Sequence, residues 1–420
     1  MNLTVRALIG SGIGFAYLLV EAIGMLLVVK TSNQEFGVVE AGLVANLFYI
    51  FGLFNVFTVC YGTMLARGIA RSDEVAREAL AKEGLAKTRV VGVAIAAILA
   101  VALFSSLMLG SSNLTLPAIV ILSIGFASGW LFRSLGLVAA FSSVGRGDIG
   151  ADKRYQLVFS MATYVTLLTA VLLLHLRPVV AAAWSVVLCG FLQLTIRRGG
   201  GWTILTCISG PVSADLRGVF RHTSQYLVTG ATGYLVVNGD AIVVGISLGP
   251  KSLTDYLALS KLILGVFSLS GLPGSVLLPY LSAASAAKDR NRYRHLTVVA
   301  VGASLFLTLC GIIVSVMVYP SIQVWATGGD LLPPTVVTVG MLNGALLGVV
   351  AAVGWPLLAT SRTNLALPTA VDAAITIIGG FTFAYSFGMV GIITMAILAH
   401  VASLALQWRV AVVAMRDFAR

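Results

Sequence analysis

Residues 7–29 read ALIGSGIGFAYLLVEAIGMLLVV, an apolar run in which Glu21 is the one ionised residue. About 20 apolar residues are enough for a helix to cross a bilayer. A barrel strand would alternate in polarity, and lipid offers no partners to an open backbone, so the run is predicted to be a helix. It is too long for the core of a signal peptide, and we interpret it as a first membrane span that is retained.

Similar runs recur along the whole chain, bounded by charges or by Gly, Pro, Ser and Asn. We therefore expect an all-α integral membrane protein with twelve transmembrane helices. The remaining predicted spans are 38–66, 90–109, 116–141, 157–176, 178–196, 224–248, 256–287, 296–318, 334–358, 365–386 and 389–408.

The composition excludes most other classes of protein. Of the 420 residues, 58% are hydrophobic and 10% are charged, whereas a soluble domain has about 45–50% and 25%. This excludes a soluble enzyme, a nucleic-acid-binding protein and a disordered chain. The four cysteines show neither metal-ligand nor disulfide-framework spacing. We expect no metal site and no cofactor, and the protein is not expected to be an enzyme.

The distribution of basic residues predicts the orientation. If the N-terminus is cytoplasmic, 22 of the 27 Lys and Arg residues lie in cytoplasmic segments, and Lys30, Arg177 and Lys251 lie outside. Such a bias in short loops is a strong topology signal. We predict a multi-pass protein of the cytoplasmic (inner) membrane with both termini in the cytoplasm.

Two cytoplasmic connections have distinct compositions. Residues 72–89 are rich in helix formers and charges, which predicts a short helix on the inner surface. Residues 198–220 contain a glycine run and Pro211, which predicts a linker between an N-terminal six-helix lobe (1–197) and a C-terminal six-helix lobe (221–420).

The two halves also show a weak internal repeat. A shift of 219 residues places Glu21-Ala22-Ile23 over Asp240-Ala241-Ile242. Six spans and six spans in the same orientation form a parallel repeat, related by a pseudo-two-fold axis along the membrane normal. Two such bundles are expected to enclose a central cavity, where transporters of this design bind substrate.

Ionisable residues inside the spans are the candidate functional groups, because each costs at least a few kcal/mol in a bilayer. The candidates for binding a coupling ion, H⁺ or Na⁺, are Asp240, Glu21, Asp372 and His400. Arg133 is a deep cation that could hold a phosphate or carboxylate, and Lys261 lies nearer the outer end of its span. The alternative for each is a structural role: a satisfied carboxylate, a cation that reaches the headgroups, or a packed histidine.

Two stretches resemble a known family. VNGDAIVVGISLGPKSLTDYLAL at 237–259, followed by AKDRNRYRHL at 287–296, resembles the junction of spans seven and eight in Wzx-type polysaccharide flippases. EFGVVEAGLVANLFYIFGLFNVFTVCYGTMLARGIARSDE at 35–74 resembles the family's second span, with its R-x-I-A exit at 67–70. The likeness covers the whole chain in layout, but specific residues only in 6–72 and 221–296.

The resemblance implies the MOP superfamily, alternating access, and transfer of an undecaprenyl-pyrophosphate-linked oligosaccharide to the outer leaflet. It implies partners in a polysaccharide polymerase and glycosyltransferases, and we expect a monomer. This chain departs from the family's arginine-rich cavity, because its in-span charges sum to −1 and Arg133 is the one deep cation. The inner-rim residues Arg6, Arg67 and Arg221 are then candidates to receive the headgroup.

Three other functions are alternatives to a polysaccharide flippase. A drug or cation exporter of the same superfamily is favoured by the net negative in-span charge. A sugar-type facilitator would carry G-x-x-x-D-R-x-G-R-R, which ARGIARSDEVAR at 66–77 does not match. A membrane enzyme such as an O-antigen polymerase or ligase would need a large outer loop, whereas the longest one predicted is 319–333.

The topology can be tested by cysteine labelling on a background without the four native cysteines. A cysteine at Leu331 should react with a membrane-impermeant reagent in intact cells, and one at Asn291 should react only after permeabilisation. The reverse pattern would contradict the orientation.

Overall fold

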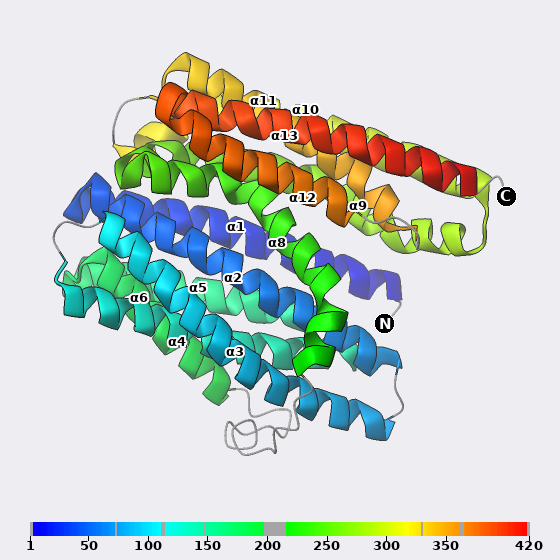
Figure 1. The fold of residues 1–420 in the computed structure, drawn as a ribbon, viewed down its shortest axis with the longest axis horizontal. Helices are drawn as coiled ribbons and strands as arrows, with labels where there is room; N and C mark the ends of the chain where they lie inside the picture. Colours follow the sequence, from blue (N-terminus) through cyan, green and yellow to red (C-terminus); the bar gives the residue numbers. More distant parts are fainter. Residues whose placement is uncertain are drawn as a thin grey trace. The chain divides into compact units, whose positions relative to one another are not determined.

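The computed structural model describes residues 3–71, 74–110, 114–146, 148, 150–196, 216–328, 331–360 and 365–417, and the regular structure in these ranges is entirely helical (Figure 1). Most of the predicted linker, 198–215, lies outside the described residues. The chain divides into two compact units, Met1–Ala231 and Thr232–Arg420. The lobe boundaries predicted from the sequence stay a prediction.

Unit 1 is a bundle of long helices. Its elements are α1 (Leu3–Phe36), α2 (Val38–Arg71), α3 (Glu74–Gly110), α4 (Leu116–Gly145), α5 (Ala151–Leu174), α6 (Pro178–Ile196) and the start of α8 (Leu216–Ser247). Unit 2 holds the rest of α8, then α9 (Gly249–Ala286), α10 (Arg290–Thr327), α11 (Pro334–Leu358), α12 (Ala366–Ala374), the π-helix η2 (Ile375–Gly379) and α13 (Gly380–Asp417).

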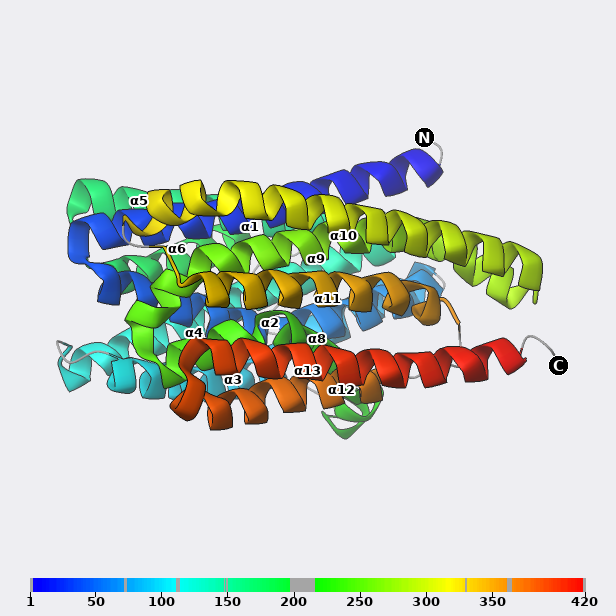
Figure 2. The same ribbon diagram turned by 90° about the horizontal axis from the view of Figure 1, so that it is seen from above.

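The last two predicted spans form a hairpin. Gly388, within α13, has φ 58° and ψ −141°, a backbone conformation that glycine adopts without steric cost. The chain turns back there, between the orange and red segments of Figure 2. Within the described residues, ten helices are long and apolar enough to cross a membrane. One of them, Ala366–Val412, contains this turn, and Pro178–Gln193 is a shorter apolar helix. The predicted all-α membrane fold is confirmed.

The two units repeat the same neighbour relations. In unit 1, α4 packs on α2, α3 and α6, and α2 packs on α3. In unit 2, α11 packs on α9, α10 and α13, and α9 packs on α10. The second, third, fourth and sixth spans of each half therefore have the same partners. This recurrence supports the internal repeat seen in the sequence.

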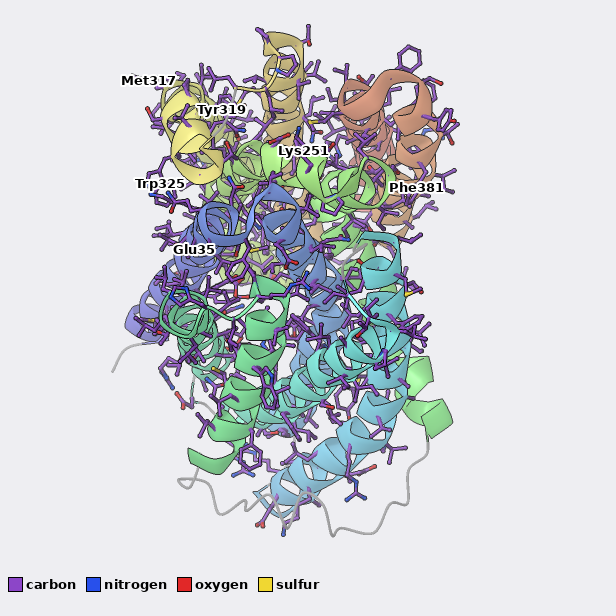
Figure 3. The ribbon with its side chains drawn as sticks, turned by 90° about the vertical axis from the view of Figure 1, so that its left-hand side faces the viewer. Glu35, Lys251, Met317, Tyr319, Trp325 and Phe381 are labelled. Carbon is purple, nitrogen blue, oxygen red and sulfur yellow. The ribbon has the colours of Figure 1, made fainter. Side chains whose placement is uncertain are left out.

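Two local predictions need correction. Residues 74–89 do not form a separate surface helix. They form the N-terminal part of α3, which continues into the membrane span. The segment contains no proline, and the ion pairs Glu78–Lys82 and Glu83–Lys87 favour a continuous helix. The outer loop 319–333 is also shorter than expected, since α10 runs to Thr327. Figure 3 labels Tyr319 and Trp325 near that end of α10, where Tyr319 Oη accepts a hydrogen bond from Leu332 N at 3.3 Å.

Close packing of α4 on α6 depends on Gly129. A Cβ at this position would lie 2.6 Å from Val186 Cγ1 and 2.8 Å from the backbone atoms Val186 C and Val187 N. One turn earlier, a Cβ at Gly125 would lie 3.9 Å from Ala183 Cβ, an ordinary contact.

We predict that Gly129→Ala lowers the free energy of unfolding by about 1–3 kcal/mol, because the helices must separate. Gly125→Ala is the matched control and should have little effect. Thermal unfolding of the purified variants measures both, and equal stability of the two would contradict the packing argument.

Candidate ion and substrate sites

Glu21 joins α1 to α5 in unit 1. Its Oε1 accepts a hydrogen bond from Ser160, and its Oε2 accepts one from the Tyr164 hydroxyl at 2.9 Å. Tyr17, one turn earlier on α1, lies within hydrogen-bonding reach of both Glu21 and Arg133. Several hydroxyl donors around one carboxylate stabilise its ionised form. Hydrogen bonds from α5 therefore hold the Glu21 carboxyl group of α1 in place.

Arg133 lies on α4 and is only 2% exposed. Its guanidinium carbon is 4.7 Å from the Phe159 ring centroid and 5.4 Å from that of Phe51, within cation–π distance of both. Its Nε and Nη1 have no hydrogen-bond partner in the described part of the chain. Unit 1 therefore contains a deep cation with unused donors.

Asp240 lies on α8 in unit 2 and is 5% exposed. Its Oδ2 accepts hydrogen bonds from the Tyr256 hydroxyl at 2.6 Å and from Asn343 Nδ2 at 3.4 Å. Its Oδ1 accepts one from the backbone N–H of Ala241 at 2.7 Å. Three donors from α8, α9 and α11 fix this carboxylate in place.

Asp372 and His400 form a completely buried pair on the two arms of the last hairpin. His400 Nδ1 is 3.0 Å from both Asp372 Oδ1 and Asp372 Oδ2. Thr376, in the π-helix, donates to Asp372 Oδ1 at 3.5 Å. His400 Nε2 has no partner among the described residues. One imidazole nitrogen is thus held by a carboxylate and the other is available.

The two acidic sites of unit 2 are neighbours. A Cβ at Gly239 would lie 3.2 Å from Thr376 Cγ2, so α8 passes close to η2 beside both sites. Asp240 and His400 are near enough for their charges to interact. Asp240, Asp372 and His400 therefore belong to one buried polar region of unit 2.

Lys261 lies on α9 and is half-buried. The side chains of Arg6, Arg67 and Arg221 lie outside the described residues. The search for three or more His, Cys, Asp or Glu side chains able to hold a metal ion found none within the described ranges.

Sequence reasoning missed the partners of the acidic residues. Ser160, Tyr164, Tyr256 and Asn343 lie far from Glu21 and Asp240 in the chain, and only the packing of the helices shows them together. The Asp372–His400 pair did carry a signal. The two residues flank the turn at Gly388 by 16 and 12 residues, which places them at similar depth on antiparallel helices.

Comparisons with known proteins yield structural relatives only. No family model and no curated protein sequence matches the chain. The fold matches an inward-facing multidrug resistance MATE family transporter of the MOP superfamily, with TM-score 0.72 and 15% identity over 98% of this chain and 99% of the other. It also matches the lipid II flippase MurJ in its inward closed conformation, with TM-score 0.67 and 14% identity over 98% and 90%.

A third match is a MOP superfamily transporter from Pyrococcus furiosus, described as having a binding pocket of reverse polarity. Its TM-score is 0.59, with 16% identity over 97% of this chain and 95% of the other. These identities establish the architecture and leave the substrate open. The chain is a multi-pass membrane protein with the fold of the MOP superfamily transporters.

Proposed function

We propose that the protein is an ion-coupled secondary transporter that moves an undecaprenyl-pyrophosphate-linked oligosaccharide from the inner to the outer leaflet by alternating access. The fold shared with transporters and a flippase supports transport. The Wzx-like stretches at 35–74 and 237–259 support the lipid-linked glycan. The observation that carries ion coupling is the buried Asp372–His400 pair.

This pair is suited to a proton. Hard cations such as Na⁺ prefer oxygen ligands, whereas here both oxygens of Asp372 face an imidazole nitrogen at 3.0 Å. Histidine changes charge near neutral pH. A proton gained or lost at His400 alters the balance of charge against Asp372 and the nearby Asp240. We therefore assign proton exchange to His400 and Asp372, with Asp240 as the neighbouring acidic group.

The substrate head is anionic and requires cations. Arg6, Arg67 and Arg221 are proposed to receive it at the inner rim, and Lys261 is proposed to act nearer the outer end. Arg133 is the deep cation with donors available for a phosphate oxygen. A polysaccharide polymerase and glycosyltransferases are the proposed partners, and the protein is proposed to act as a monomer in the inner membrane with both termini cytoplasmic.

A MATE-like drug or cation exporter is the second candidate. It is favoured by the three in-span carboxylates, Glu21, Asp240 and Asp372, and by the match to a MATE family transporter. Loss of surface glycan on deletion, restored by the wild-type gene, supports the flippase. Unchanged glycan with increased sensitivity to cationic drugs would support the exporter.

We expect Asp372→Asn and His400→Gln to remove most transport per folded molecule, and to flatten its dependence on pH, because each breaks the proton-exchanging pair. Asp148→Asn is the control, since Asp148 pairs with Arg154 in an exposed turn. Surface glycan is measured against folded protein level at several pH values. Wild-type activity and pH profile in both variants would exclude the pair as the coupling site.

The pair should also be coupled energetically. His400→Leu leaves the Asp372 carboxylate buried without its partner and should cost about 3–5 kcal/mol of stability. Adding Asp372→Asn should recover part of that loss, because the uncompensated charge is removed. Thermal unfolding of the two single variants and the double variant measures the coupling. Strictly additive effects would show that the two side chains do not interact.

A further inference from the structure

The donors around Arg133 outnumber the acceptors available to them. Arg133 is 2% exposed, and its Nε and Nη1 are unpaired in the part of unit 1 that the structure describes. The nearby carboxylate, Glu21, is already held by Ser160 and Tyr164. A buried charge without a hydrogen-bonded counter-charge is strongly destabilising. Tyr17 lies within hydrogen-bonding reach of this guanidinium, but Nε and Nη1 still lack an acceptor.

Two aromatic rings restrict what that acceptor can be. The guanidinium lies over Phe159 at 4.7 Å and over Phe51 at 5.4 Å. Aromatic faces attract the cation but cannot accept its in-plane N–H groups as a carbonyl or carboxylate would. Only the edge of the guanidinium remains for bonding. Because Arg133 is 2% exposed, a ligand at this edge has to be small enough to fit inside unit 1.

Two further buried side chains with unpaired donors lie one helical turn from Arg133 or from its ring partner Phe159. Gln156 is 3% exposed with Nε2 unpaired, and it shares a face of α5 with Phe159, three residues on. The same turn of α5 contacts α4, because the Tyr155 hydroxyl donates to the Arg133 carbonyl oxygen at 3.2 Å. Trp130, one turn before Arg133 on α4, is fully buried with Nε1 unpaired. Unpaired N–H groups near a buried cation need an acceptor, and an anion would supply both the acceptor and the opposite charge.

We propose that Arg133, Gln156 and Trp130 form a binding site inside unit 1 for one compact anion, with the chemistry shared by a halide and a single phosphate group. The case of a free ion is independent of the proposed function, whereas the case of a lipid phosphate rests on it. The anion is either a free ion that stabilises unit 1 or one phosphate of the transported lipid. Binding to purified protein separates this proposal from any measurement of transport.

The test is thermal unfolding in neutral detergent at constant ionic strength and pH. Sodium gluconate is replaced stepwise by sodium chloride, by sodium phosphate, or by gluconate containing a short-chain isoprenyl pyrophosphate. A saturable rise of roughly 5 °C in the unfolding midpoint is expected for wild type. It should vanish in Arg133→Gln and remain in Arg154→Gln, which alters an exposed arginine. A rise with chloride or phosphate indicates a free ion, and a rise with the pyrophosphate alone indicates the substrate. No rise with any of them overturns the proposal.

A second variant, Gln156→Glu, tests the same proposal if Arg133→Gln does not fold. This nearly isosteric change places a carboxylate beside the guanidinium as a tethered anion. We expect the variant in gluconate to unfold at or above the midpoint of wild type with saturating anion, and to respond no further to added anion. If Gln156→Glu is less stable than wild type in gluconate, the donors do not converge on an anion, and the proposal is wrong.

Discussion

A charge buried in a bundle that faces hydrocarbon must be compensated by groups within the bundle, and this constraint governs the structure. Lipid supplies neither water nor counter-ions, so an isolated ion would cost several kcal/mol or more. The described in-span carboxylates meet this requirement with local donors. Glu21 has Ser160 and Tyr164, and Asp240 has Tyr256 and Asn343. The bonds of Glu21 join α1 to α5, and those of Asp240 join α8 to α9 and α11, so both carboxyl groups also link helices within their unit.

The two units compensate their buried charges with different residues. Four helices of each unit repeat the same neighbour relations, and the sequence repeat aligns Glu21 with Asp240. Unit 1 sets a cation, Arg133, beside its acid, whereas unit 2 adds a second acid with a histidine. The described charges of the two units therefore differ: an arginine lies near the acid of unit 1, and a histidine lies near the two acids of unit 2.

The sequence predicted the fold almost completely and the sites only in part. Apolar runs and charge bias are local properties, so the helices and the hairpin at 365–408 could be found by reading along the chain. The extension of α3 to Glu74 was missed because a charged segment can be either a surface helix or the end of a span. Glu21, Arg133, Asp240, Asp372 and His400 were found because charge is rare in a span. Their partners were not, because serine, tyrosine and asparagine are common in spans and only packing selects among them.

The π-helix η2 is an irregular turn that lies beside Asp372 and α8. It covers Ile375–Gly379, directly after the turn of α12 that carries Asp372. One residue is inserted relative to an α-helix, which disrupts the i→i−4 bonding and is uncommon away from functional sites. The insertion shifts every later side chain by about 100° around the axis. Thr376 within it bonds Asp372, and Gly239 of α8 packs against it. The irregular turn thus contacts Asp372 through Thr376 and lies against α8 at Gly239, the residue next to Asp240.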